Sequence, residues 1–290
     1  KILEQQQAPP GDLDAKLREI AAHYKELLQN WEAVQSSDPQ IVKLKAEAKQ
    51  AIDAGDYDKA EGLLEDIAKH YSTAAAKAHA DNARLQRVRL RYAKAAAYWQ
   101  KAAALLPEES KKERSRYLHS AGYDLHSIAE YTKALPLFEQ SLAINQEVGN
   151  RAVEGTTLNN IGMIYDAQGK YDKALPLLEQ SLAIFREIGN RDREVTLLNI
   201  IAWIHQARDE YDKALSLYKQ SLAISQEIDN RQQEVEISWT IVRIYKLQGD
   251  LTKAEQYIAR LVQLAEEIGH PLLEVWRKDL EKLRAEIKEQ

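Results

Sequence analysis

Histidine is the residue type here best suited to acid–base or metal chemistry, because the 290-residue chain contains no cysteine. His119 and His126 lie seven residues apart on one predicted helix, so they should share a face two turns apart. A metal site needs further ligands, and neither an HExxH motif nor an acidic cluster accompanies this pair. We therefore interpret both histidines as groove-lining or solvated residues and expect no metal site.

The other polar residues form no catalytic pattern either. The absence of cysteine excludes thiol catalysis, disulfides and cysteine-based zinc sites. The glycines are isolated at predicted helix turns, so no phosphate-binding loop is present. Aspartate and glutamate are numerous, but as i,i+4 partners of lysine and arginine on helix surfaces. We predict a protein that is not an enzyme and binds no cofactor.

The composition of the chain limits which classes of partner it can bind and in which compartment it is expected. The formal net charge of −5 argues against nucleic acid as a partner. No apolar run reaches the roughly 18 residues that a bilayer requires. The lack of cysteine fits a reducing compartment, and we expect a cytoplasmic protein without membrane contact. Because the chain starts at Lys1 rather than Met, we also expect it to be part of a longer one.

The elements that would position these residues are set by an internal repeat. The segment KALPLLEQSLAIFREIGN at 173–190 recurs at 133–150 with 14 of 18 positions identical, and again at 213–230. The period is therefore 40 residues, which is typical of a solenoid whose units bury their apolar faces by stacking. Only 11 Gly and 7 Pro interrupt a chain rich in good helix formers, so the units should be helical.

Proline, glycine and asparagine at predicted helix boundaries divide the chain into four parts. Residues 1–37 read as a linker followed by an amphipathic helix that caps the array. Residues 38–107 hold two divergent helix pairs, with Pro107 ending the second, and residues 108–270 hold four regular 40-residue units. Residues 271–290 read as a C-terminal capping helix that begins at Pro271. Gly or Asn at the helix ends, as at Gly149 and Asn150, can adopt the left-handed conformation that terminates a helix.

The spacing within a unit resembles the tetratricopeptide repeat. The clearest unit carries the motif residues Leu158, Ile161, Gly162, Tyr165, Gly169, Tyr171, Ala174 and Leu178. Its neighbours depart from the pattern at Leu125, which replaces the helix-end Tyr, and at Val242, which replaces a small residue. Four units in register extend the resemblance over about residues 40–270.

The resemblance implies an all-α, right-handed superhelical solenoid of about six antiparallel helix pairs plus terminal capping helices. The period exceeds the usual 34 residues by about six, close to one extra turn per helix. The sequence of the repeated segment is similar to that of the long-repeat variant found in bacterial multidomain signalling proteins and animal polarity adaptors. Gly162, Ala202 and the alanines at 134, 174, 214 and 254 would sit where helices cross, because larger side chains would separate the helices.

In arrays of this kind the first helices of all units line a concave groove. Their non-core residues at the front of the chain are Lys45, Lys49, Arg84, Arg87, Arg91, His119, Tyr123 and His126. Those of the later units are Asn159, Asn160, Met163, Asp166, Asn199, Trp203, Gln206, Trp239, Arg243 and Lys246.

Two sets within this groove allow alternative readings. Trp203 and Trp239 are either buried by the long helices or are groove anchors of the kind that dominates binding energy. If they are anchors, the asparagines would hydrogen-bond the backbone of a bound peptide. Arg84 and Arg87 are either a solvated helix face or a basic stripe for an acidic segment.

We therefore expect a non-enzymatic interaction module that binds a peptide or protein segment in the groove. The alternative is a ligand-sensing regulatory domain of a larger signalling protein whose effector lies outside this chain. We expect a monomer, although the helix at about residues 12–35 offers a route to a dimer.

Overall fold

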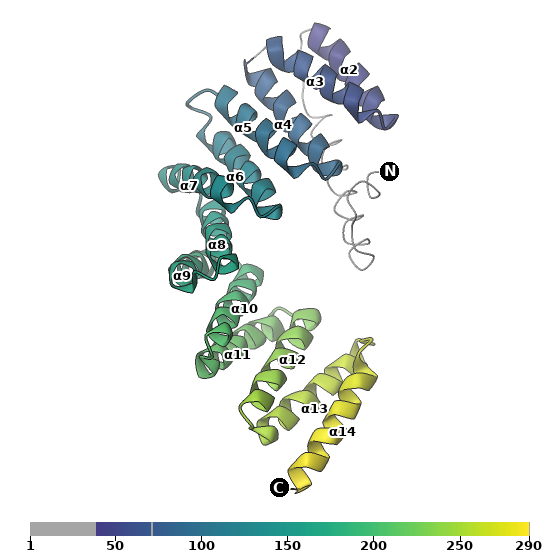
Figure 1. Ribbon diagram of the computed structural model, residues 1–290, viewed down its shortest axis with the longest axis vertical. Helices are drawn as coiled ribbons and strands as arrows, with labels where there is room; N and C mark the ends of the chain where they lie inside the picture. Colours follow the sequence, from purple (N-terminus) through teal and green to yellow (C-terminus); the bar gives the residue numbers. More distant parts are fainter. Residues whose placement is uncertain (1–38, 71, 290) are drawn as a thin grey trace. The chain divides into compact units, whose positions relative to one another are not determined.

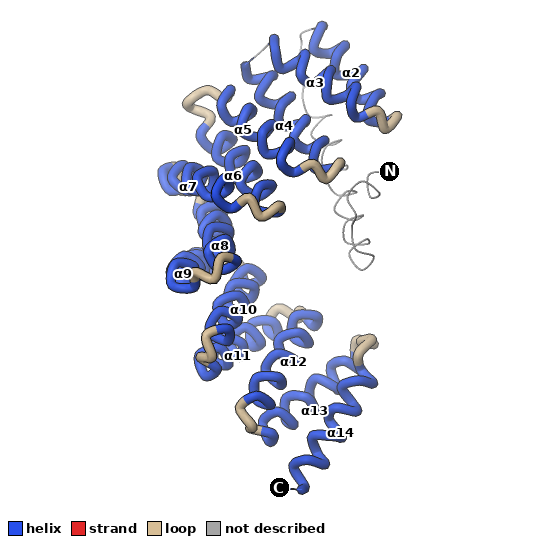
Figure 2. Tube along the Cα trace, in the orientation of Figure 1, coloured by secondary structure: helices blue, strands red, loops and turns tan. Residues whose placement is uncertain are grey.

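Every regular element in the described part of the chain is a helix (Figures 1 and 2). The computed structural model describes residues 39–70 and 72–289. Their helices are α2 (Pro39–Asp53), α3 (Tyr57–His70), α4 (Ser72–Val88), α5 (Tyr92–Leu105), α6 (Lys111–Ser127), α7 (Tyr131–Glu147), α8 (Arg151–Ala167), α9 (Tyr171–Glu187), α10 (Arg191–Ala207), α11 (Tyr211–Glu227), α12 (Arg231–Leu247), α13 (Leu251–Glu267) and α14 (Leu273–Glu289). The predicted all-α class is confirmed. The predicted linker and first amphipathic helix lie outside the described residues.

The helices belong to two compact units, and the division falls inside α8. The first unit ends at Asn160 and the second begins at Ile161. In the first unit α2 packs on α3, α4 on α5 and α6 on α7. In the second unit α10 packs on α11 and α12 on α13, while α14 covers α13. None of the helices in the described residues is both long and apolar enough to cross a bilayer.

The 40-residue period follows from helix and turn lengths. The helices from α6 to α13 each contain 17 residues, and three-residue turns join them. Two helices and two turns make one period, so the predicted spacing is consistent with the helix layout. The last turn of the series, after Glu267, is longer and ends in α14, which buries Trp276, Leu280 and Leu283. A capping role for α14 stays a prediction.

At the turns between helices, one residue ends the first helix and the next residue begins the following helix. Gly149, Gly169 and Gly189 adopt φ values of 67°, 68° and 70°, the left-handed region that only glycine enters without strain. The asparagines that follow Gly189 and Asp229 cap the next helix instead. Asn190 accepts a hydrogen bond from the backbone N–H of Arg193, and Asn230 accepts one from Gln233, as N-caps do. The sequence permits either Gly or Asn in the left-handed conformation; at these two turns Gly189 and Asp229 adopt it, with φ of 70° and 55°, and the asparagine caps the next helix.

Small residues allow the two helices of a pair to approach closely, as predicted. A Cβ built on Gly162 would lie 2.8 Å from Cγ of Leu178 on α9. A Cβ on Gly122 would lie 2.9 Å from the ring of Phe138 on α7. The alanines at 134, 174, 214 and 254 are all fully buried. These positions therefore build the scaffold.

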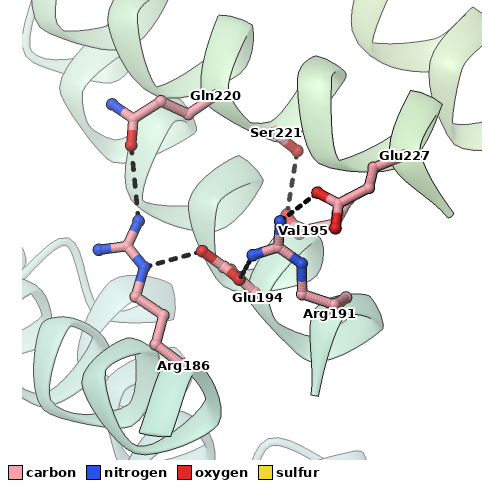
Figure 3. A network of polar contacts seen from close by, with 7 residues as sticks. All are labelled: Arg186, Arg191, Glu194, Val195, Gln220, Ser221 and Glu227. Carbon is pink, nitrogen blue, oxygen red and sulfur yellow. Dashed lines mark hydrogen bonds and ion pairs between the residues drawn. The ribbon is translucent and has the colours of Figure 1, made fainter. Parts of the chain in front are cut away.

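A buried glutamate in the first turn of α10 fixes this helix to its neighbours (Figure 3). Glu194, which is 3% exposed, accepts hydrogen bonds from Nε of Arg186 at 2.8 Å and Nη1 of Arg191 at 2.6 Å. Arg191 also donates to Glu227 at the end of α11. One carboxylate thus joins α9, α10 and, through Arg191, α11. Because its charge is paired twice, its burial is tolerable.

The same contact recurs with the period. Glu154 accepts from Nη1 of Arg151 at 2.7 Å, and Glu234 accepts from Nη1 of Arg231 at 3.1 Å. From the sequence alone, such glutamates are expected to be surface partners of lysine and arginine. Each of these carboxylates is instead buried, and it pairs with an arginine three residues earlier, at the start of the same helix.

Candidate peptide-binding groove

Four of the predicted groove residues in the second unit, Asp166 among them, line one cavity. Met163 comes from α8, and Asn199 and Trp203 come from α10. The cavity has a volume of about 380 Å³. We call it the Trp203 cavity; its other lining residues are Asp166, Ile200, Tyr218, Glu236, Ile237 and Thr240.

The repeat places these side chains together. Met163 and Trp203 are one 40-residue period apart, so they occupy the same slot on successive first helices. Asn199 lies one helical turn before Trp203 on the same face. Glu236 and Thr240 lie on α12, the next first helix. Three first helices therefore contribute, with Tyr218 of α11 as the exception.

The two tryptophans have different environments. Trp203 is 48% exposed and forms a T-shaped pair with Tyr171, at a centroid distance of 6.5 Å. Trp239 is half-buried and packs on Trp276 of α14, with the ring centroids 5.8 Å apart. Trp203 thus leaves about half of its side chain exposed, whereas Trp239 forms part of the contact with the last helix.

Two polar atoms in the Trp203 cavity are buried without a hydrogen-bond partner. They are Oδ1 of Asn199 and Oδ1 of Asp166. Burial raises the pKa of Asp166 above its usual value. Unpaired buried acceptors are costly, so such atoms stand out in a folded protein. Both require a donor.

Sequence reasoning missed Glu236 and Tyr218 as lining residues. Glu236 occupies the position that Thr196 and Thr156 hold one and two 40-residue units earlier, and this register could have revealed it. Tyr218 belongs to a second helix, which we had assigned to the scaffold alone. Its hydroxyl donates to Oε1 of the predicted groove residue Gln206 at 3.5 Å, and burial raises its pKa to about 12.

In the first unit the predicted residues His119 and Asn160 bond to each other. The amide of Asn160 donates to Nε2 of His119 at 3.2 Å, and Nδ1 of His119 lies 3.0 Å from Oγ1 of Thr157. The Thr157 hydroxyl in turn donates to the carbonyl of Val153 at 2.7 Å. This chain of bonds suits a neutral imidazole, and burial, with the charge of Arg87, lowers the pKa of His119 to about 4.

The two predicted arginines are neither solvated nor free. Arg84 pairs with Asp81 at 2.7 Å, and Arg87 pairs with the buried Asp124 at 2.5 Å. Both guanidinium groups also lie about 5 Å from the ring centroid of Trp99 (5.2 and 5.3 Å). Internal carboxylates therefore already occupy the groups that we expected to face solvent or an acidic segment.

The remaining candidates lie on first helices of the two units. Tyr123 is 48% exposed beside Arg87, and burial lowers the pKa of the half-buried His126. Asn159 donates to Oδ1 of Asn160 at 3.4 Å, while its own Oδ1 is buried and unpaired. Arg243 and Lys246 are exposed.

A second cavity, of about 560 Å³, lies in the first unit. Its lining residues are Lys112, Glu113, Ser115, Arg116, His119, Ser120, Asn145, Asn150, Val153 and Thr156, so it shares only His119 with the predicted groove. Within the ranges described, no group of three or more His, Asp or Glu side chains is placed to hold a metal ion.

Sequence comparison finds one family. Two models described as tetratricopeptide repeat match residues 153–227 and 235–268. No curated protein matches the chain.

Three solved structures of similar fold share little sequence with this chain. The apo form of RapI is 16% identical, with a TM-score of 0.57 over 86% of this chain and 99% of that one. Aspartyl phosphate phosphatase F from Bacillus subtilis is 16% identical, with a TM-score of 0.56 over 98% and 79%. The TPR-like repeats of a putative kinesin light chain from Podosopora anserina are 18% identical, with a TM-score of 0.56 over 68% and 98%. At these identities the likeness concerns the fold.

Proposed function

For this tetratricopeptide-repeat chain we propose a non-enzymatic role, in which the first helices bind an extended segment of a protein or peptide. The observation that carries the proposal is the Trp203 cavity. An indole that is 48% exposed stands beside a cavity of about 380 Å³ and an unpaired amide oxygen. Tryptophan is among the residue types that contribute most to binding energy, and its exposure here has no role in packing the scaffold.

Asn199 suits a peptide backbone. A side-chain amide offers both a donor and an acceptor, as a peptide bond does, so Asn199 can pair with an extended main chain. The absence of cysteine fits a reducing compartment, so we place this activity in the cytoplasm.

Display of a random hexapeptide library against the immobilised chain tests the proposal. We expect the wild-type chain to enrich a related set of peptides. Trp203→Ala should weaken binding of the best peptide by at least about tenfold, because a buried aromatic anchor is worth about 2 kcal/mol or more. Helical circular dichroism should not change, since the indole is not in the core.

Leu247→Ala is the matched control. Leu247 is an apolar side chain that is 66% exposed at the end of α12 and outside the cavity. Its removal should leave peptide binding unchanged. The proposal is wrong if the wild-type chain enriches no peptide, or if Trp203→Ala and Leu247→Ala bind alike.

A further inference from the structure

We infer that the Trp203 cavity accepts a basic side chain, arginine or lysine, of the bound segment. The inference rests on the proposed function and specifies the chemistry of the partner at this site. The two charged residues that line the cavity, Asp166 and Glu236, are both acidic.

Two acceptors on residues that line the cavity have no donor in the described chain. Oδ1 of Asp166 and Oδ1 of Asn199 are buried and unpaired. An amide can turn to present its NH₂ group instead, so Asn199 alone does not select a charge. An ionised carboxylate can only accept hydrogen bonds, because it carries no donor. Asp166 therefore makes the site selective for a donor, and the best donor for a desolvated carboxylate is a cation.

The position of Asp166 in its helix strengthens this preference. It is the penultimate residue of α8, which ends at Ala167. The carbonyl groups at a helix C-terminus carry partial negative charge, which attracts a cation to the same place. The equivalent slots in the next two units hold Gln206 and Lys246, so this acidic helix end belongs to one unit only.

Trp203 supplies the second element of cation recognition. Its side chain is 48% exposed, and its ring contact is a T-shaped pair with Tyr171 at an interplanar angle of 79°. Tryptophan is the aromatic residue that attracts ammonium and guanidinium groups most strongly. An arginine side chain stacked on this ring would bring its amino groups toward the unpaired acceptors.

A nearby cation does not fill this role. The charge of Arg243 acts on Tyr218 and slightly offsets the rise in that hydroxyl's pKa. Arg243 is nevertheless exposed and does not line the cavity. The carboxylate of Glu236 accepts a bond from the neutral amide of Gln232 at 2.9 Å and likewise has no cationic partner in the lining.

The test uses the hexapeptides enriched by the wild-type chain in the library experiment. We expect arginine or lysine at one fixed position of these peptides. Replacing that arginine by citrulline, which is neutral and of similar shape, should weaken binding by about tenfold, the usual effect of losing a charge-assisted hydrogen bond. Raising the salt concentration should weaken binding of the arginine peptide more than that of the citrulline peptide.

Variants of the chain complete the test. Asp166→Asn should remove the discrimination between arginine and citrulline, and Glu236→Gln should reduce it. Glu179→Gln changes the net charge equally at an exposed residue of α9, outside the cavity, and should leave the discrimination intact. A circular dichroism spectrum for each variant shows that it is folded.

The outcomes separate the two proposals. Enriched peptides without a preferred basic position would refute the cation site while supporting the interaction module. Equal discrimination by Asp166→Asn and Glu179→Gln would also refute the cation site. No enrichment of any peptide would overturn both proposals.

Discussion

The buried side chain of His119 ties the stability of the first unit to pH. His119 is buried with its ring nitrogens near Asn160 and Thr157, and its pKa falls from the ordinary 6.5 to about 4. Between these values the unfolded chain binds a proton at this site and the folded chain does not. Stability should therefore fall as pH decreases from about 6.5 to 4, by up to about 1.4 kcal/mol per pH unit, and level off below.

Urea unfolding of the wild type and of His119→Gln at pH 7 and pH 5 measures this contribution. A comparison of the two chains is necessary, because burial raises the pKa of Asp81 to about 6 and acts in the opposite direction. We expect the wild type to lose more stability than the variant between the two pH values. Equal losses would show that His119 titrates normally in the folded chain.

At the level of elements, the alanine at each helix crossing sets how close two helices come. Ala174 is fully buried on α9, beside the position where a Cβ on Gly162 would collide with Leu178. Ala174→Leu should overpack this crossing and cost about 1–3 kcal/mol of unfolding free energy.

The control for this substitution lies on the same helix. Ala183 is exposed on α9, so Ala183→Leu adds the same atoms to the surface without a clash. Chemical denaturation of both variants should show a lower midpoint for Ala174→Leu only. An unchanged midpoint would mean that Ala174 does not mark the crossing.

The helices could be predicted from the sequence because each is specified locally. Turn glycines such as Gly169, the apolar periodicity and the repeat itself all act within about 40 residues. The different fates of Trp203 and Trp239 could not be predicted, since Trp239 is covered by Trp276, which comes from a helix beyond the last regular unit. The internal pairing of Arg87 with Asp124 depends likewise on two helices meeting in space.

Across the whole molecule, the recurring glutamate contact predicts that units can be removed in steps of one period. Deleting residues 191–230 joins Asn190 to Arg231 and recreates the natural sequence Asn-Arg at the junction. Glu234 would then meet Arg186 in place of Gln226, which is the contact that Glu194 makes now. The shortened chain should fold cooperatively, with lower stability because one interface is lost.

Deleting only residues 191–210 removes half a period and serves as the comparison for the deletion of a whole unit. It removes one helix, so α11 would follow α9 and two second helices would have to pack together. We expect this chain to lose cooperative unfolding, as followed by circular dichroism in urea. If both deletions unfold alike, the units are not equivalent parts of the array.

The constant Glu–Arg contact also bears on how such a gene changes. Recombination between two copies of the repeat, in phase, would insert or remove a whole unit and leave every junction chemically the same. The predicted groove positions are not constant in this way. One position of the repeat holds His119, Asn159, Asn199 and Trp239 in four successive units. Unequal crossing-over can therefore lengthen, shorten or reorder the surface that a partner meets while the core is inherited unchanged.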